Sequence, residues 1–282
     1  MAAATSDSGK SQAQLIYEQQ RRRQRRFSTG VNVSYLVLLG VLFLAFSGLQ
    51  VNILGVQLKT IQLDWAFIFE RAPFIFGGVG LTILLAILSI SLACVLALLG
   101  ALGRLSKFPP AYALATFYIS LIRGTPLLLQ IIFIFLGLPQ LGITPGGMTA
   151  GVLALGINYG AYMTEIMRAG IQSVGVGQRE AALAIGMTPS QIMRRIVLPQ
   201  ALKLVVPPIG NEFIAMLKDT ALISVTGFVW EILWRAQKVG RANFRSLEAL
   251  LVAAVFYWII TIMFTMVQGR IEAYVARGDR TL

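Results

Sequence analysis

The stretch APFIFGGVGLTILLAILSISLACVLALLGALG, residues 72–103, contains no charged residue. A bilayer core about 30 Å thick requires roughly 20 apolar residues in one helix, so this stretch is long enough to cross a membrane. A second uncharged stretch, residues 124–164, has room for two crossings with a Gly- and Pro-rich turn near residues 137–147. The sequence therefore predicts an integral membrane protein.

Other apolar runs bring the predicted number of crossings to about six, in an all-α fold. The expected helices cover residues 33–49, 73–103, 111–137, 148–170, 200–223 and 249–268. The first run could instead be a signal peptide cleaved near Ala45-Phe46-Ser47. Its long, basic leading segment favours an uncleaved anchor.

Composition excludes several kinds of site. Of the 282 residues, 56% are apolar and 13% are charged, whereas a soluble domain carries about 25% charged residues. The chain has no histidine and one cysteine, which rules out a Ser-His-Asp triad, a histidine-containing zinc site and an intrachain disulfide. We therefore predict no catalytic residue and no metal site, and we expect Cys94 to pack in the core.

The net charge of +12 is unevenly distributed. Of the 24 Lys and Arg residues, 16 fall in segments 1–32, 104–110, 168–203 and 269–282, and only 7 fall in segments 50–72, 139–147 and 218–246. Lys and Arg accumulate in cytoplasmic loops, so we expect both termini to be cytoplasmic. The run Arg21–Arg26 could also bind nucleic acid or anionic lipid, but its place directly before the first span favours a topological role.

The longest internal loop predicted to be cytoplasmic has its own helix signals. Gln178–Ile185 is rich in helix formers and is followed by Gly186, which suits a left-handed C-terminal turn. Thr188-Pro189-Ser190-Gln191 then offers a capping box with proline at the first helical position. We predict a second short helix, residues 189–197, ended by Leu198-Pro199. Two short helices joined by a tight turn would form a rigid docking element for a partner.

The spacing within this loop resembles the "EAA" loop of ABC importer permeases. Glu180-Ala181-Ala182 is followed after three residues by Gly186, and after nine more by Ile196-x-Leu198-Pro199. The flanking motifs are similar to those of the polar amino acid subfamily, which includes histidine, arginine, glutamine and glutamate permeases. These motifs are Arg123-Gly124-Thr125-Pro126, Asn158-Tyr159-Gly160-Ala161-Tyr162 with Glu165 and Arg168, Lys218-Asp219-Thr220, Pro199-Gln200-Ala201 and Asn211.

The resemblance implies a type I ABC importer-like fold in a bacterial inner membrane, with an ATPase-coupling loop at residues 171–199. The coupling residues would be Glu180, Ala181, Ala182, Gly186, Ile196, Leu198 and Pro199. The implied partners are a cytoplasmic ABC ATPase dimer, a second permease (identical or paralogous), an extracytoplasmic amino-acid-binding protein and the lipid bilayer, with no nucleic acid. The chain has no Gly-x4-Gly-Lys-Ser/Thr loop, so ATP and Mg would be bound by the ATPase, with no cofactor here.

The expected organisation has four parts. Residues 1–32 would be a disordered basic segment in the cytoplasm, and residues 33–71 an extra span with an external linker. Residues 72–268 would be the permease transmembrane domain, and residues 269–282 a cytoplasmic tail. Many members of the subfamily have five spans, so the helix at 33–49 is a departure from the family pattern.

Polar groups at membrane depth are costly and commonly functional, so they mark the predicted substrate path. Asn158, Tyr162 and Glu165 fall on one helix face, although Glu165 could simply pair with Arg168. Arg123 could hold a substrate carboxylate or brace the kink that follows it. The path residues we predict are Arg123, Asn158, Tyr162, Glu165, Asn211, Glu212, Lys218 and Asp219.

Four of these assignments have a structural alternative or depend on a helix break. Lys218-Asp219 could meet the two charges of a zwitterion or form an interfacial salt bridge. Pro207-Pro208 should break the last-but-one span and leave Asn211 and Glu212 beside the break. The glycines at 147, 151, 156 and 160 indicate close helix packing, and Trp230, Trp234, Arg235 and Lys238 indicate an interfacial helix.

The predicted function is that of a non-enzymatic permease subunit of an ATP-driven importer for a polar amino acid. One alternative is a permease for another small solute such as an opine, because the sequence of the docking loop does not determine which substrate is bound. An alternative from a different functional class is a membrane scaffold or signalling protein that retains the permease fold.

Overall fold

The structure, a computed structural model, describes residues 12–53 and 56–276. The chain divides into two compact units, residues 1–65 and residues 66–282. Residues 1–11, part of the predicted disordered segment, and residues 277–282 of the predicted tail lie outside the described residues.

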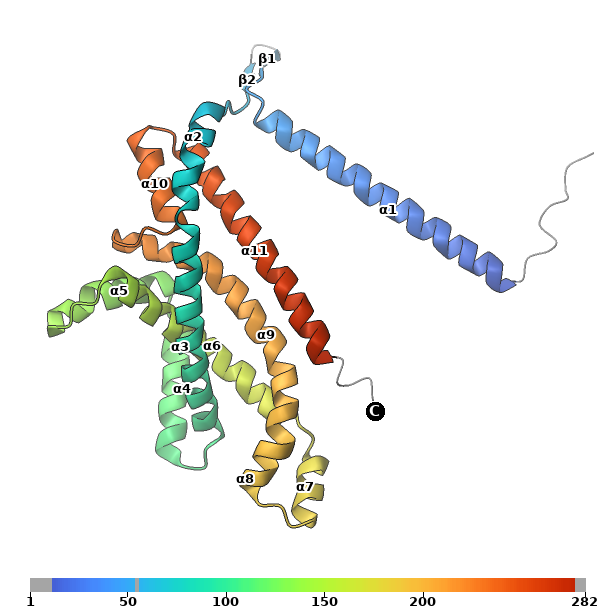
Figure 1. The fold of residues 1–282 in the computed structure, drawn as a ribbon, viewed down its shortest axis with the longest axis vertical. Coiled ribbons are helices and arrows are strands. Elements are labelled where there is room, and N and C mark those ends of the chain that lie inside the picture. The colour runs from blue at the N-terminus through green and yellow to red at the C-terminus, as the bar shows by residue number, and fades with distance from the viewer. Residues whose placement is uncertain (1–11, 54–55, 277–282) are drawn as a thin grey trace, which may run out of the picture. The chain divides into compact units, whose positions relative to one another are not determined.

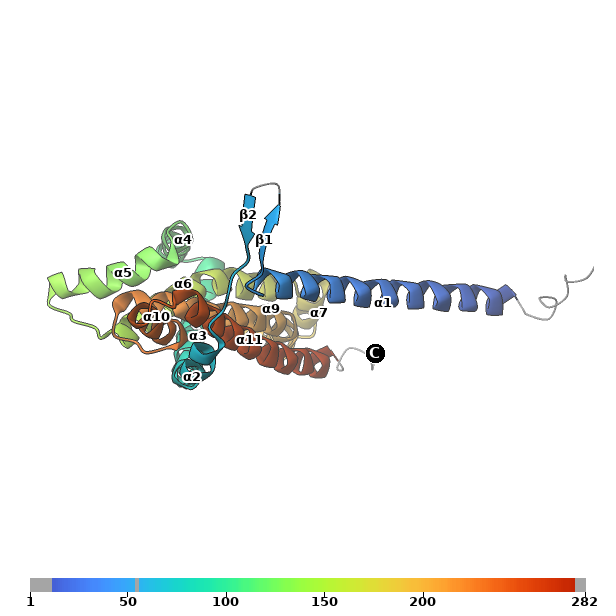
Figure 2. The same ribbon diagram turned by 90° about the horizontal axis from the view of Figure 1, so that it is seen from above.

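The first unit contains one long helix, α1 (Gln12–Ala45), and a hairpin of β1 (Gln50–Ile53) and β2 (Val56–Lys59). The two strands lie side by side in Figure 2, and their antiparallel register pairs Gln50 with Lys59. The prediction of disorder through residue 32 is wrong from Gln12 onward, because this segment is rich in the helix formers Gln and Arg and continues without a break into the apolar run. The hairpin was not predicted, although its strands alternate polar and apolar residues.

In the described part of the second unit every regular element is a helix, and the first two helices together form one apolar segment. Helices α2 (Trp65–Phe76) and α3 (Val79–Leu105) are separated at Gly77-Gly78. Helices α4 (Pro109–Arg123) and α5 (Leu127–Gly137), followed by the 3-10 turn η1 (Leu138–Leu141), replace the single helix predicted over residues 111–137. The pair is bent by 104° (Figure 1). Pro126 causes the break because it lacks an amide hydrogen and disfavours helix at the residue before it.

The rest of the second unit runs through one central helix to the coupling loop and back. It consists of α6 (Gly147–Gln172), α7 (Val176–Ala184), α8 (Pro189–Ile192), the π-helix η2 (Met193–Val197), α9 (Leu198–Asp219), the 3-10 helix η3 (Thr220–Thr226), α10 (Ile232–Ala242) and α11 (Ser246–Ala276). Within this unit, α7 and α8 lie at one end, and α2 and α10 lie at the other (Figure 1).

Glycines let α6 approach its neighbours closely, as the small-residue spacing predicted. A Cβ on Gly156 would lie 2.5 Å from Leu92 Cδ2, and one on Gly151 would lie 2.5 Å from Ile223 Cδ1. The fully buried Leu85, Leu155 and Met216 belong to the apolar cluster at this centre, and Cys94 packs against it. The result is a rigid central helix with no room for larger side chains at these positions.

Three segments of the described residues are long and apolar enough to cross a bilayer: Gln19–Ala45, Trp65–Leu105 and Ser246–Val275. The bent pair α4–α5 would be a fourth. The number of spans predicted from sequence is larger because it includes α6 and α9, which are long enough but carry more polar residues. Both helices contribute apolar side chains to the cluster in the centre of the unit.

Candidate functional site

The coupling loop (residues 171–199) has a small apolar core of its own. Ala182 is only 2% exposed and packs in a cluster with Ile171, Val174 and Ile192. The predicted capping box is confirmed: Thr188 accepts from the Gln191 amide, and the Gln191 side chain accepts from the Thr188 amide. The loop is therefore a folded element rather than a simple connection.

Polar side chains tie α7 to its two flanking helices. The Arg179 guanidinium donates to the Ile171 carbonyl oxygen in α6. The Gln200 amide in α9 donates to the Gln178 side chain in α7. Gly186, with φ of 82°, makes the left-handed turn that ends α7. These contacts fix the orientation of α7 between α6 and α9.

The opposite side of α7 is exposed. Glu180 and Ala181 are both exposed, next to two apolar side chains, Leu183 at 54% and Ile185 at 79% exposure. Sequence reasoning did not select Leu183 or Ile185, although apolar residues in the last turn of an otherwise polar helix were a usable signal. An exposed carboxylate beside small and apolar side chains is suited to docking on a protein surface.

The coupling loop continues into α9 without interruption, and the predicted break at Leu198-Pro199 is wrong. The Leu198 amide donates to the Met193 carbonyl, so the helix widens to a π-turn over Met193–Val197. A proline ring in a regular α-helix clashes with the carbonyl four residues before it, and the wider turn accommodates Pro199. Ile196 is half-buried, whereas Leu198 and Pro199 are exposed. The helical path from Pro189 to Asp219 therefore links the coupling loop to the far end of α9.

Pro207-Pro208 also fails to break α9, contrary to the prediction. The helix persists because α11 packs along this face and Gln268 donates to the Pro207 carbonyl, 3.2 Å away. Gln268 also donates to Asn211 at 2.9 Å. Asn211 is thus held on the α11 side of α9.

The bend between α4 and α5 is stabilised by Gln130. Its amide donates to the Ile122 carbonyl at 2.8 Å and to the Thr125 hydroxyl at 2.8 Å. Its carbonyl oxygen accepts from Asn158 of α6 at 3.1 Å. The sequence left Arg123 with two possible roles, holding a substrate carboxylate or bracing this bend, and Gln130 was not predicted to take part. Arg123 is exposed, with its guanidinium 4.9 Å from the Tyr162 ring centre.

Four of the predicted path residues line one cavity of about 390 Å³ beside this bend: Asn158, Tyr162, Glu212 and Asp219. Thr125, Pro126, Leu127 and Tyr159 complete the lining. The volume falls in the usual range for small-molecule sites, about 300–1,000 Å³. The α4–α5 break, α6 and α9 each contribute to it, so the cavity depends on the bend that Gln130 holds.

The cavity carries two carboxyl groups. The Tyr159 hydroxyl donates to Asp219 Oδ2 at 2.8 Å, which fixes one of them. Glu212 is half-buried in the same lining. Hydroxyl, amide and carboxylate groups around a space of this size can accept hydrogen bonds from an ammonium group.

The remaining path candidates lie outside this lining. Glu165 Oε2 pairs with Arg168 Nη2 at 2.6 Å, and Glu165 Oε1 lies 3.5 Å from Arg104 Nε of α3. The structural alternative for Glu165, pairing with Arg168, is therefore present. Lys218 is exposed and does not line the cavity, whereas Asp219 does.

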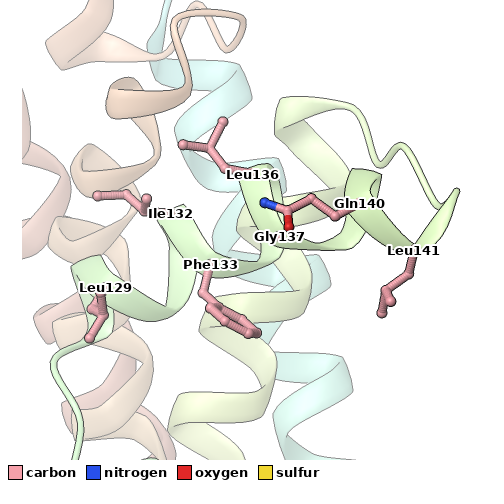
Figure 3. Close-up of a pocket in the computed structure, with 7 residues that line it drawn as sticks. All are labelled: Leu129, Ile132, Phe133, Leu136, Gly137, Gln140 and Leu141. Atoms are coloured by element: carbon pink, nitrogen blue, oxygen red, sulfur yellow. The ribbon is translucent and has the colours of Figure 1, made fainter.

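A second hollow, of about 430 Å³, lies along α5 and η1 (Figure 3). Its lining is apolar except for Gln140 and comprises Leu129, Ile132, Phe133, Leu136, Gly137, Gln140 and Leu141. An apolar lining does not compensate a zwitterion for its lost hydration. The cavity beside the bend is therefore the better candidate for a polar solute.

The helix α10 is the amphipathic element predicted near Trp230. The rings of Trp230 and Trp234 stack with centroids 5.3 Å apart. Lys238 Nζ lies 4.9 Å from the Trp234 centroid, and Arg235 stacks on Phe74 of α2 at 5.0 Å. Stacked indole rings next to cations are typical of helices at a membrane–water boundary.

Residues 93–277 match the protein family described as the binding-protein-dependent transport system inner membrane component. The match covers the end of α3 and every later helix, including the coupling loop and the cavity beside the bend. It excludes α1 and the hairpin, which belong to the first unit.

Several curated proteins are similar to the chain. The arginine transport system permease protein ArtQ of Bacillus subtilis is 35% identical over 219 residues, covering 77% of this chain and 100% of the relative. The L-cystine transport system permease protein TcyB of the same organism is 41% identical, covering 73% and 89%. The glutamine transport system permease protein GlnP of Escherichia coli is 37% identical, covering 75% and 97%.

Two solved structures have similar folds. The crystal structure of an amino acid ABC transporter with histidines aligns with a TM-score of 0.71 and 38% identity, covering 76% of this chain and 100% of that one. An inward-facing structure of the MetNI methionine ABC transporter aligns with a TM-score of 0.59 at 16% identity, covering 76% and 99%, which shows a likeness of fold alone. The resemblance and the type I importer-like fold predicted from the sequence are confirmed.

Proposed function

Because the chain belongs to the family of binding-protein-dependent transport system inner membrane components, we propose that it is the permease subunit of an ATP-driven importer that moves a polar amino acid into the cytoplasm. The relatives are amino acid permeases for arginine, cystine and glutamine. A scaffold or signalling role, and an opine as substrate, are not favoured by these likenesses.

The observation that best supports ATP-driven transport is the folded coupling loop. Its inner side packs through Ala182, and its outer side exposes Glu180 and Ala181 with Leu183 and Ile185. The small Ala181 lets another backbone approach, and Glu180 supplies a charge that a basic group can meet. This surface docks on a cytoplasmic ABC ATPase dimer, which binds ATP and Mg.

The continuous helix from Pro189 to Asp219 supplies the mechanical connection. Glu212 lies 23 residues after Pro189, a rise of about 35 Å at about 1.5 Å per residue. Movement of the coupling loop on ATP binding therefore displaces α9, which contributes Glu212 and Asp219 to the cavity. Hydrolysis in the partner thereby changes the shape of the cavity in this chain.

The cavity beside the bend receives the substrate. The carboxylates of Glu212 and Asp219 accept hydrogen bonds from its ammonium group, and Asn158 and Tyr162 contact its other polar atoms. An extracytoplasmic amino-acid-binding protein delivers the substrate from the opposite side of the membrane. A second permease, identical or paralogous, completes the pathway, and both termini of this chain lie in the cytoplasm.

Co-purification with the ATPase tests the docking role. Glu180→Arg reverses the exposed charge and should abolish assembly with the ATPase and ATP-dependent uptake together. Glu70→Arg is the matched control, because Glu70 is also exposed but lies on α2, and it should leave both readouts unchanged. Normal assembly and uptake by the Glu180→Arg protein would refute the docking role.

A further inference from the structure

Five arginines lie together in α1, directly before its apolar run in the sequence. Arg21, Arg22, Arg23, Arg25 and Arg26 are all exposed, and α1 is one uninterrupted helix through this band and the apolar segment (Figure 1). The arginines are therefore held at fixed heights relative to the apolar segment. A disordered tail, as predicted from the sequence, would not fix them in this way.

The height of the band coincides with the headgroup layer of a bilayer. The segment Phe27–Ala45 has 19 residues and rises about 28 Å, close to the bilayer core of about 30 Å. Every side chain from Tyr35 to Leu39 and from Val41 to Leu44 is apolar or aromatic and more than half exposed, as lipid-facing residues should be. Arg21–Arg26 rises about 9 Å more, beside a headgroup layer that is about 5–8 Å thick on each side.

The arginines also point in different directions around the helix. At about 100° per residue, the five positions spread over roughly 200° of the circumference. A flat protein surface or a single nucleic-acid backbone would meet only part of that arc, whereas lipid headgroups surround a membrane helix on all sides. Each guanidinium can hold a phosphate through two parallel hydrogen bonds.

We propose that Arg21–Arg26 is a binding site for the phosphate groups of anionic phospholipids, such as phosphatidylglycerol. Basic segments next to the end of a membrane helix attract anionic lipid surfaces. The site fixes the depth of α1 in the bilayer. It does not depend on the transport function proposed above, since it uses only the first unit.

Native mass spectrometry of the purified full-length protein in detergent tests the site directly. The protein is titrated with phosphatidylglycerol, with phosphatidylcholine, with inorganic phosphate and with a short DNA duplex. Wild type should bind phosphatidylglycerol on the order of tenfold more tightly than phosphatidylcholine, since each arginine near a headgroup adds to the attraction. Because the assay uses detergent, the orientation of α1 in the original membrane does not enter the result.

Two partial variants assign the binding to the band and keep some arginines in case the full replacement does not fold. One carries Arg21→Gln, Arg22→Gln and Arg23→Gln, and the other carries Arg25→Gln and Arg26→Gln. Each should lose most of the preference for phosphatidylglycerol. The control carries Lys107→Gln and Arg270→Gln, which removes exposed charges from the second unit and should keep the preference.

Three results would overturn the proposal. Equal binding of the two lipids by wild type would show that no anionic site exists. Full preference in both partial variants would place the site elsewhere. Saturation by inorganic phosphate, or tighter binding of a short DNA duplex than of phosphatidylglycerol, would assign the arginines to a free phosphate or to nucleic acid instead.

Discussion

Gln130 holds the bend between α4 and α5 with hydrogen bonds to Ile122, Thr125 and Asn158. An amide side chain suits this position because it donates to carbonyls freed by Pro126 while it accepts from α6. From the sequence, Arg123 was one candidate for bracing this bend, because a charged residue within a span is uncommon. The role of an uncharged Gln in an apolar run depends on which carbonyls the tertiary bend releases, and spacing alone does not reveal that.

Replacing Gln130 with leucine should destabilise the protein by about 1–3 kcal/mol, because buried polar partners lose their hydrogen bonds. Thermal unfolding in detergent measures the loss. Gln140→Leu is the matched control, since Gln140 is exposed on η1, and it should change the unfolding free energy little. Equal effects of the two variants would contradict the bracing role.

Glu231 is fully buried at the start of α10, where it caps the helix by accepting from the Leu233 and Trp234 amides. Burial raises the pKa of this carboxyl above its usual value, and hydrogen bonds from Tyr257 and the two amides lower the pKa by less than that. Because its pKa is raised in the folded state, Glu231 makes its full contribution to the free energy of unfolding below the ordinary glutamate pKa of about 4.3. That contribution is lost as the pH rises through the pKa of the folded state.

Glu231→Gln should therefore flatten the pH dependence of stability. The melting temperature of wild type in detergent should fall as the pH rises from about 4 toward neutrality, with part of that fall due to Glu231. The melting temperature of the Glu231→Gln variant should fall less than that of wild type over the same pH range. An unchanged profile, measured side by side, would mean that the buried carboxyl does not control stability in this range.

At the scale of elements, the local signals in the coupling loop were enough to predict the turn and the capping box. Gly186 and Thr188–Gln191 act through their own backbone, so the sequence alone determines them. The continuity of α8, η2 and α9 was not predictable in the same way. Proline is expected to break a helix, and here a widened turn packed against α7 and α8 accommodates Pro199.

Gly186→Ala tests whether the turn at the end of α7 takes part in the proposed coupling to the ATPase. A non-glycine residue in a left-handed conformation costs about 1–2 kcal/mol, so the variant should be less stable by that amount. Gly227→Ala is the matched control, because Gly227 has a φ of 76° but ends η3, away from the coupling loop. Both variants should unfold at a lower temperature than wild type. Only Gly186→Ala should reduce ATP-dependent uptake when uptake is expressed per amount of folded protein. Similar uptake by the two variants would argue against coupling through this turn.

At the scale of the whole molecule, the arrangement of α4, α6 and α9 decides which polar residues meet. Of the three residues that periodicity placed on one face of α6, Asn158 and Tyr162 line the cavity and Glu165 does not. Periodicity could not separate Glu212 and Asp219, which line the cavity, from Asn211 and Lys218, which do not. That distinction depends on the rotation of α9 against α11, where Gln268 binds Asn211.

The same arrangement predicts that Asp219→Asn weakens uptake. Removing a charged acceptor from the cavity should raise the substrate KM on the order of tenfold or more, since a charge-assisted hydrogen bond is worth about 1.5–3 kcal/mol. Lys218→Gln is the adjacent control and should change KM little, because Lys218 lies outside the cavity. A larger effect of Lys218→Gln than of Asp219→Asn would place the substrate elsewhere.

Uptake by reconstituted proteoliposomes tests the central claim most directly. The chain is inserted with its ATPase and its amino-acid-binding protein, and accumulation of radiolabelled arginine, glutamine and cystine is followed with ATP on the ATPase side. If the chain is an importer permease, at least one amino acid should accumulate against its gradient. This accumulation should require ATP, the binding protein and Glu180. Equilibration without ATP, or no uptake by an assembled complex that hydrolyses ATP, would contradict the central claim.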